Sequence, residues 1–157
     1  MKRLLALAAA ATLALTAVAT AGAKRPGAQE SFTFGDATIL GPVHVRGTVA
    51  QVHVRYSCDV GTHLWVSAKQ SASRAIDPAV SAEGAGFGGA AAAWWQSHRG
   101  SFTCDGQRHV AWFSVDTVEP GSRGDLRRGW AWVQFCVTTD TDLSAVRMAW
   151  TRVVVNR

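Results

Sequence analysis

The sequence has few charged residues and no stretch of sustained helical periodicity. Only 17% of the 157 residues are charged, against 48% hydrophobic, which excludes a disordered tail, and the length favours one compact domain over a multi-domain protein. The missing three- and four-residue apolar spacing argues against a helical bundle. Seven Trp, fifteen Gly and three Cys instead indicate a secreted, turn-rich protein.

The N-terminus has the three parts of a secretory signal peptide. Lys2-Arg3 gives the positive start, residues 4–19 are apolar, and residues 21–23 are the small residues Ala-Gly-Ala. A membrane-spanning helix is the alternative, but the stretch is rich in weakly apolar Ala and Thr, and charge resumes directly afterwards. We expect a signal peptide over residues 1–23, cleaved after residue 23 or after residue 21, and then an extracellular protein with no stable membrane insertion.

Basic residues outnumber acidic ones, sixteen to eleven, yet this excess does not predict a nucleic-acid partner. Binding by counterion release needs Lys and Arg concentrated on one face. Here they are scattered among the acidic residues along the chain. Signal cleavage would also remove two of them, so we expect no nucleic acid as partner.

Period-two alternation predicts an all-β fold. In the clearest strand, residues 51–58, Val52, Val54, Tyr56 and Cys58 share one face. Three hairpins are expected, the second of them around the Asp105-Gly106 turn: 51–58 with 63–69, 97–104 with 107–118, and 129–138 with 146–155. Weaker strands between residues 31 and 48 bring the total to about seven, as in an immunoglobulin-like antiparallel β-sandwich.

The expected sandwich domain spans residues 31–157, after a short flexible segment at residues 24–30. Its one irregular part is the connection at residues 71–96, and loops of such length are usually functional or mobile. Ala90–Trp95 within it could form a single helical turn, because Ala has the best helix propensity.

Cys58 and Cys104 are predicted to form a disulfide between the two sheets. Each shares the parity of inward-facing neighbours on its strand, and export to an oxidising compartment favours pairing. The alternative is that both are reduced and simply packed. Cys136 is the odd cysteine and is expected to be a buried free thiol. Pairing with either of the other two, or a link between chains, stays open.

Several segments together resemble a group of small secreted actinobacterial proteins that are immunoglobulin-like and of unknown function. The resemblance covers residues 45–155, and its motifs are those of a disulfide-stapled scaffold: Val-His-Val-Arg-Tyr-Ser-Cys at 52–58, Ser-Ala-Lys-Gln at 67–70, Gly-x-Gly at 84–86, Thr-Cys-Asp-Gly at 103–106, and Gly-Trp-Ala at 129–131. It implies an immunoglobulin-like fold and an extracellular location, and it supplies no activity. Members often carry a further cysteine pair after residue 135, whereas this chain has Cys136 alone.

Short motifs that suggest ligand binding lack their required context. Residues 84–89 match the spacing of a dinucleotide-binding glycine loop, but no hydrophobic strand or βαβ unit precedes them. Arg123-Gly124-Asp125 matches an integrin-binding tripeptide, and its neighbouring turn residues favour a solvated turn. Asp140 and Asp142 lack the other ligands of a calcium loop.

No pattern for a metal site or for nucleophilic catalysis is present either. The histidines lack the short spacings of a zinc site and are expected to face solvent: His44, His53, His63, His98 and His109. No nucleophile elbow of the G-x-S-x-G type occurs. We therefore expect no metal, no cofactor and no enzyme activity.

The tryptophans carry the remaining functional signal. Trp130 and Trp132 share a parity opposite Ala131 and Val133, so both faces of that strand are apolar, although one face of a two-layer sheet should be wet. The Trp pair lies in the core, which is the expectation, or the segment ending at Trp95 covers the outer face, or aromatic rings are exposed. Exposed rings would form a platform for sugars or a partner. The platform candidates are Trp65, Trp94, Trp95, Trp130 and Trp132.

The sequence thus predicts a secreted, non-catalytic β-sandwich protein that acts by surface recognition. The alternative is a carbohydrate-binding module that takes cell-wall or extracellular polysaccharide on its tryptophans. An extracellular hydrolase is a third reading, disfavoured because no triad or metal cluster is legible.

Overall fold

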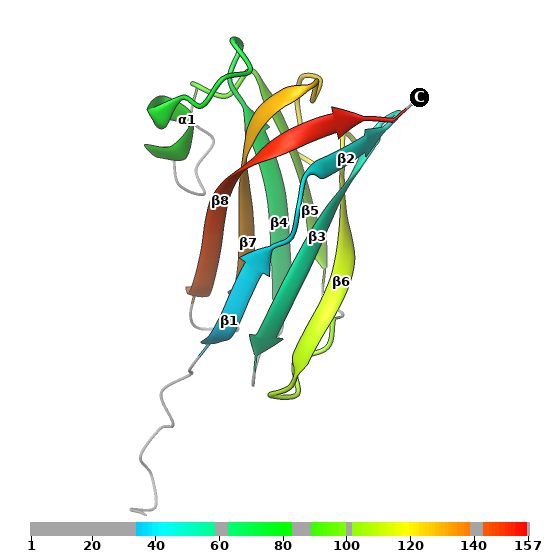
Figure 1. The fold of residues 1–157 in the computed structure, drawn as a ribbon, viewed down its shortest axis with the longest axis vertical. Helices are drawn as coiled ribbons and strands as arrows, with labels where there is room; N and C mark the ends of the chain where they lie inside the picture. The colour runs from blue at the N-terminus through cyan, green and yellow to red at the C-terminus, as the bar shows by residue number, and fades with distance from the viewer. Residues whose placement is uncertain (1–33, 59–62, 83–88, 100–101, 139–142, 157) are drawn as a thin grey trace, which may run out of the picture. The chain divides into compact units, whose positions relative to one another are not determined.

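The computed structural model shows a closed β-barrel (Figure 1). The structure describes residues 34–58, 63–82, 89–99, 102–138 and 143–156, with only the backbone described at 34–36 and 143–146. These residues lie in one compact unit that spans residues 31–157. The described elements, in chain order, are β1 (Phe34–Ile39), β2 (Val43–Arg46), β3 (Val49–Cys58), β4 (His63–Gln70), α1 (Pro78–Ala82), β5 (Ala93–Arg99), β6 (Arg108–Asp116), β7 (Gly129–Thr138) and β8 (Leu143–Val155).

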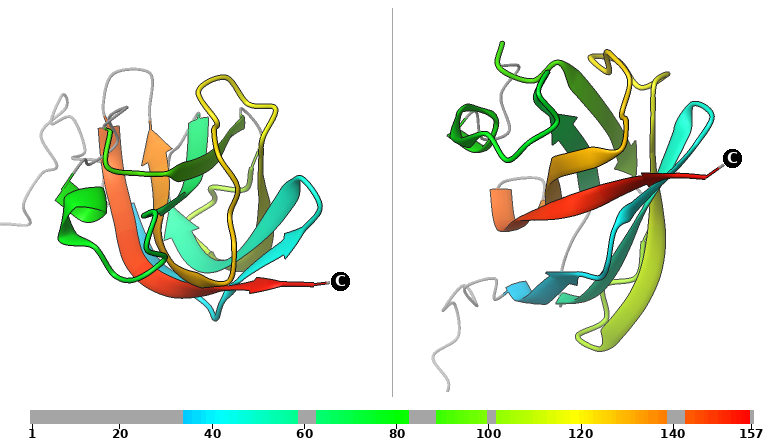
Figure 2. Two further views of the ribbon diagram at one scale, coloured as in Figure 1. Left: turned by 90° about the horizontal axis from the view of Figure 1, so that it is seen from above. Right: turned by 45° about the horizontal axis from the view of Figure 1, so that its top comes forward.

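Seven strands form the barrel, in the ring order β3-β2-β8-β7-β4-β5-β6, and β6 pairs back onto β3 (Figure 2). The β3–β6 ladder is antiparallel and runs from Val49↔Asp116 to Ser57↔Arg108. A short parallel pairing, from Val43↔Val153 to Val45↔Val155, joins β2 to β8 and so connects β3 and β2 to β8 and β7. β1 pairs with the second half of β3, on the edge that β2 occupies along the first half.

The expected immunoglobulin-like sandwich is therefore wrong, and so is the fold that the resemblance implied. A sandwich keeps two separate sheets, whereas here one ladder continues around from β3 to β6. In-and-out alternation along a strand is the same in both architectures. What distinguishes them is the long-range pairing of β3 with β6 and of β2 with β8, which leaves no local signal in the sequence.

The strands lie close to where alternation predicted them, but two of the three hairpins are wrong. β3 pairs with β1, β2 and β6, while β4 pairs with β5 and β7. Within the described residues, β5 and β6 pair only at Gln96↔Asp116, and residues 102–104 belong to no strand. The β7–β8 hairpin is confirmed, from Gly129↔Val153 to Thr138↔Leu143. Period two fixes which face a residue takes, and it leaves the neighbouring strand unspecified.

The long connection is shorter than expected because β5 begins at Ala93. The predicted helical turn at residues 90–95 is wrong: Ala93 and Trp94 are in register with Gln70 and Lys69 of β4. Among the described residues, the one helix is α1, which starts at Pro78. Proline suits the first position of a helix because the backbone N–H it lacks would have no partner within the helix. The Asp77 carboxylate accepts a hydrogen bond from the Ala79 N–H (3.0 Å) and caps the helix start.

The inside of the barrel is a packed core. Alternate residues of β3 and β7 point inward, among them Val52, Val54 and Phe135. Tyr56 packs against Phe135 with ring centroids 5.5 Å apart, and Phe113 of β6 lies 5.3 Å from the same ring. The parity predicted for residues 51–58 is confirmed.

The alternation along β7 places Trp130 and Trp132 on the outside of the barrel. Ala131, Val133 and Phe135 occupy the core on β7, so the expectation that the Trp pair is internal is wrong. Because residues along a barrel strand point alternately inward and outward, the indoles of Trp130 and Trp132 lie on the outer surface of β7.

Several features predicted from the sequence lie outside the described residues. This applies to the signal peptide at 1–23, the segment at 24–30, residues 84–88 of the glycine motif, and the pair Asp140 and Asp142. Among the residues that the structure does describe, no helix has the length and apolar character needed to cross a membrane.

Candidate functional site

The outer wall formed by β2, β3 and β6 carries an exposed indole. Trp112 of β6 keeps 52% of its surface exposed, the highest value among the seven tryptophans. It lies directly opposite His53 of β3. The next pair along the ladder, Gln51↔Ser114, and its neighbour His44 on β2 complete the area. We call these five residues, His44, Gln51, His53, Trp112 and Ser114, the Trp112 surface.

Ring packing holds the indole in place. The His53 imidazole stacks on Trp112 with centroids 4.2 Å apart and planes inclined by 5°. His44 approaches edge-on, with centroids 5.6 Å apart and an angle of 67°. Cross-strand aromatic pairs of this kind stabilise a sheet face by about 0.2–1 kcal/mol each. Trp112 is therefore both exposed and fixed, which is what a recognition platform requires.

Polar groups border this indole. Gln51 donates a hydrogen bond from Nε2 to Ser114 Oγ (2.8 Å), and together with His44 and Trp112 it lines a shallow hollow of about 480 Å³. Arg55 of β3 and Arg108 of β6 are exposed on the same outer face. The surface can thus combine an apolar stacking contact with amide, hydroxyl, imidazole and guanidinium hydrogen bonds.

A second aromatic area lies on β7 and β8. The Arg152 guanidinium sits 4.2 Å from the Trp130 ring centroid, and Trp132 packs on Trp150 at 5.4 Å. Trp130, Trp150 and Arg152 line an open hollow of about 390 Å³, together with Gly41, Pro42, Thr151 and Val154. All three tryptophans are half-buried. We call this area the β7–β8 hollow.

The five predicted platform tryptophans do not form one surface. Trp95 is buried in the barrel core and donates from Nε1 to the Gly124 carbonyl (2.8 Å). Trp65 and Trp94 are buried with Cys136 in a separate cluster. Only Trp130 and Trp132 remain partly exposed. Trp112 was missed, although alternation on its strand gave a signal: Phe113 and Val115 already fill the inner face, which leaves Val110 and Trp112 pointing outward.

The outer side of β4 is covered by other parts of the chain. Lys69 is fully buried, with its ammonium 4.3 Å from the Trp94 ring centroid, a contact that partly replaces lost hydration. Ser67 donates to Gln134 Oε1 (3.2 Å), and Trp65 donates from Nε1 to Gln96 Oε1 (3.0 Å). Because these polar groups satisfy one another under the loops, this face is structural and presents no platform.

The tripeptide Arg123-Gly124-Asp125 is part of that cover and is not simply a solvated turn. Arg123 exchanges two backbone hydrogen bonds of 2.8 Å with Trp94. Its guanidinium donates to the Ala91 carbonyl (3.3 Å) and lies 5.4 Å from the Trp94 ring centroid. Only Gly124 and Asp125 are exposed. An arginine held in this way cannot also reach a partner as an integrin-type motif would.

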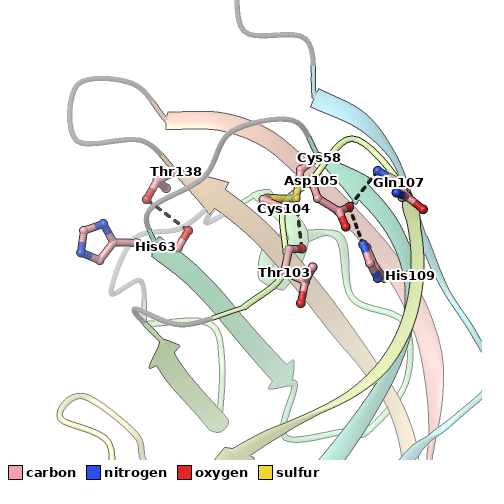
Figure 3. The surroundings of a disulfide bond; sticks show 8 residues. All are labelled: Cys58, His63, Thr103, Cys104, Asp105, Gln107, His109 and Thr138. Atoms are coloured by element: carbon pink, nitrogen blue, oxygen red, sulfur yellow. Dashed lines mark hydrogen bonds and ion pairs between the residues drawn. A yellow bond between two sulfur atoms is a disulfide. The ribbon is translucent and has the colours of Figure 1, made fainter.

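The Cys58–Cys104 disulfide is confirmed, with the two Cα atoms 4.8 Å apart (Figure 3). It joins the end of β3 to the segment that leads into β6, so it does not connect two sheets. The Cys58 sulfur lies 3.8 Å from the Thr103 carbonyl oxygen, a packing contact because a disulfide sulfur has no proton to donate. Nearby, Asp105 accepts from His109 (2.7 Å) and the Gln107 N–H (2.9 Å), and these bonds lower the pKa of Asp105.

The remaining thiol, Cys136, is free and buried on the outer side of β7. Burial raises the pKa of Cys136 to about 12. A thiolate is the nucleophilic form. This group therefore stays protonated and inert at neutral pH.

The histidines are engaged more than expected. His44 and His53 are half-buried against Trp112, and His98 bonds to Glu119 (2.8 Å) while stacking on Trp65 at 6.1 Å. His63 is exposed, as predicted. Among the described residues, no group of three His, Cys, Asp or Glu side chains is placed to hold a metal ion.

Comparison of the chain with protein-family models and with curated proteins finds no match.

Proposed function

We propose that this chain is a secreted, non-catalytic binding protein that recognises its partner through the Trp112 surface. The observation that carries the proposal is the half-exposed Trp112, which stacks against His53 across the β3–β6 ladder and is bordered by Gln51 and Ser114. Large aromatics that remain exposed on a rigid wall are typical of interaction sites. The packed core beneath supports surface recognition over binding inside the barrel.

An extracellular location is supported by two independent features. The first 23 residues have the pattern of a signal peptide. The Cys58–Cys104 disulfide suits an oxidising compartment, because cytosolic proteins rarely keep such bonds.

Carbohydrate binding is the second candidate function. It is favoured by the β7–β8 hollow, where Trp130 and Trp150 meet the Thr151 and Arg152 side chains. Indole faces stack on the apolar faces of sugar rings, while hydroxyl and guanidinium groups bond to sugar hydroxyls.

The binding proposal is tested by immobilising the full chain and passing an extracellular fraction over it. Trp112→Ala should lose the retained component, whereas Val118→Ala should keep it. Val118 is 82% exposed and lies beyond the end of β6, so it is a matched surface control. Equal retention by both variants would remove the Trp112 surface as the site. Turnover of ester, peptide or glycoside substrates would remove the non-catalytic assignment.

The carbohydrate candidate has its own test on insoluble chitin, cellulose and peptidoglycan. Adsorption should fall in Trp150→Ala, and soluble oligosaccharides should change the tryptophan fluorescence of the wild-type chain. If the chain adsorbs to none of the three polysaccharides and its fluorescence does not change, the carbohydrate hypothesis is wrong and a protein partner is left.

A further inference from the structure

Three segments of the chain meet at one end of the barrel and enclose a hollow. Gln70, at the end of β4, is in register with Ala93 at the start of β5, and β4 also runs antiparallel to β7. The loop after β4 therefore lies beside the segments that enter β5 and β7. Between these segments is a hollow of about 290 Å³, lined by Gln70, Ser71, Arg74, Asp125, Arg127 and otherwise by alanines. We call it the Arg74–Arg127 hollow.

The buried part of its lining is polar and is held by hydrogen bonds. Gln70 is only 2% exposed, and its Nε2 donates to the carbonyls of Arg127 (2.8 Å) and Trp130 (3.2 Å). The Gln70 Oε1 atom accepts from the Arg127 N–H (3.0 Å). Ser71, also buried, donates from Oγ to the Ala75 carbonyl (3.1 Å). Because these groups bond to the protein itself, the donors left for a ligand are those of the exposed lining residues.

Arg74, one of these exposed residues, has a backbone conformation that is unusual for its residue type. Its φ is +60°, and within the described residues it is the only residue other than glycine with a positive φ. Its N–H donates to the Ser71 carbonyl (3.0 Å), and its carbonyl accepts from the Trp130 N–H (2.8 Å). Glycine or asparagine would adopt this conformation with less strain. Strained residues of this kind cluster at functional sites.

Gly129, at the start of β7, leaves room for this arginine. A Cβ atom added at Gly129 would lie 2.7 Å from the Arg74 Cβ and 2.6 Å from the Arg74 carbonyl oxygen. Contacts this short are sterically excluded, so only glycine lets the two backbones approach so closely. The start of β7 and the turn after β4 together keep Arg74 at the hollow.

Two guanidinium groups provide the donors of the hollow. In the part of the chain that the structure describes, the Arg74 guanidinium is in no ion pair. Arg127 pairs with Asp125 through one terminal nitrogen, with Nη2 3.1 Å from Oδ2, and both side chains are mostly exposed. A guanidinium carries five N–H donors, so this single contact leaves most of those on Arg127 for a ligand. Two positive charges against one negative charge favour an anion.

We propose that the Arg74–Arg127 hollow binds a small ligand through an oxyanion group, a carboxylate or a phosphate. The planar guanidinium fork matches both groups in bidentate geometry, and such charge-assisted hydrogen bonds are stronger than neutral ones. The hollow, at about 290 Å³, is close to the lower limit of about 300 Å³ for small-molecule sites. It therefore suits a small acidic molecule.

This inference goes beyond the proposed function and does not depend on it. The Trp112 surface lies on β2, β3 and β6, and it shares no residue with the hollow. The hollow also gives Asp125 of the Arg-Gly-Asp tripeptide a local role, because its carboxylate orients the Arg127 guanidinium. Trp112→Ala should therefore leave anion binding unchanged.

Titration of the full chain with inorganic phosphate and with acetate tests the proposal, with NMR signals of the arginine side-chain N–H groups as the readout. Sodium chloride at equal ionic strength is the reference, because it screens exposed charges without forming a bidentate contact. At least one of the two oxyanions should shift the Arg74 and Arg127 signals to saturation, and chloride should not. Tighter binding of acetate assigns a carboxylate ligand, and tighter binding of phosphate assigns a phosphate ligand.

Two variants and a matched control make the test specific. Arg127→Ala removes one guanidinium but keeps the backbone groups that bond to Gln70, and it should weaken binding about tenfold or more. Arg128→Ala makes the same charge change at the next residue, which is exposed but does not line the hollow, and should leave binding unchanged. Arg74→Gly suits the left-handed backbone, so it should keep the fold and lose binding as Arg127→Ala does.

Three results would overturn the proposal. The first is a response to phosphate and acetate that equals the response to chloride. The second is equal weakening by Arg127→Ala and Arg128→Ala, which would indicate nonspecific attraction to surface charge. The third is full affinity in folded Arg74→Gly; if this variant does not fold, the comparison of Arg127→Ala with Arg128→Ala decides. Loss of anion binding would leave retention through Trp112 untouched, so the two proposals fail separately.

Discussion

Gly124 shows how a single residue constrains the place where a loop meets β5. Its φ is +64°, a left-handed conformation that L side chains rarely adopt. A Cβ built at this position would overlap the Ala92 carbonyl oxygen and lie 2.9 Å from the Ala93 Cα. Both obstacles are backbone atoms that the β4–β5 register and the Trp94–Arg123 bridge hold in place. The glycine therefore belongs to the fold, and not to a recognition tripeptide.

Gly124→Ala should destabilise the protein by about 3 kcal/mol, from left-handed strain of about 1–2 kcal/mol plus displacement of the Ala92 backbone. Gly41→Ala is the matched control, because Gly41 has a similar φ of +72° but nothing within 4 Å of the added carbon. It should cost only the strain. Chemical denaturation of both variants measures the difference, and equal costs would contradict the overlap.

Cys136 should make stability depend on pH in the alkaline range. Its folded pKa is raised to about 12 by burial, above the ordinary value of 9.0. The stabilisation is therefore complete below about pH 9 and is lost as pH rises toward 12, because only the unfolded thiol ionises. The loss should reach up to about 1.4 kcal/mol per pH unit.

Comparison with Cys136→Ala isolates this thiol from every other titrating group. The advantage of wild type in free energy of unfolding should shrink between about pH 9 and pH 11. In native wild-type protein, a thiol reagent should react with Cys136 only after unfolding. Rapid native reaction, or a constant difference across this range, would show that the thiol is accessible.

At the scale of elements, the disulfide between Cys58 and Cys104 links the end of β3 to the segment that leads into β6. Phe102 and Cys104 on this segment pack against the core, and the Gly106 N–H donates to the Cys58 carbonyl (2.8 Å). The disulfide thus fixes one end of the ladder that closes the barrel. At its other end, the same ladder is joined to β5 through Asp116.

Removing the disulfide should cost about 4 kcal/mol, as expected for a bond that closes a loop with a sequence separation of 46 residues. The double variant Cys58→Ala with Cys104→Ala should unfold at a lower denaturant concentration than wild type. A reductant should lower the wild-type midpoint and leave the variant unchanged. A wild-type midpoint that resists full reduction would contradict a stabilising role.

Alternation along single strands predicted more of this molecule than pairing between strands. The inward set of β3, from Val52 to Cys58, was readable because each residue's face depends only on its neighbours. The β3–β6 ladder was not, because it joins residues some sixty positions apart whose match is decided by packing. The burial of Lys69 was equally hidden, since loops that cover a sheet face leave no periodic mark.

The candidate site, too, was predictable only where it depends on local sequence and not on the pairing of distant strands. The sequence offered exposed tryptophans as an alternative to a tryptophan core, and Trp130 and Trp132 do keep some exposure. Trp65, Trp94 and Trp95 are buried by loop and core contacts. Trp112 lies where the outer face of β6 stays uncovered, which depends on the closed arrangement of all seven barrel strands.

At the scale of the whole molecule, the closed barrel decides which side of β7 faces the core. Two positions on opposite faces of β7 test this assignment. Phe135 is fully buried against Tyr56 and Phe113, while Trp132 lies on the outer wall beside Trp150. Phe135→Ala should cost about 3–5 kcal/mol, because it opens a cavity in a packed core.

Trp132→Ala removes a larger side chain but should cost less than Phe135→Ala, about 1–2 kcal/mol, since the outer wall can rearrange and part of the indole is already in water. In a sandwich with its tryptophans inside, the order of the two costs would be reversed. Equilibrium unfolding of the two variants in guanidinium therefore distinguishes the architectures without a structure. A larger loss from Trp132→Ala would mean that the barrel described here has its inner and outer walls exchanged.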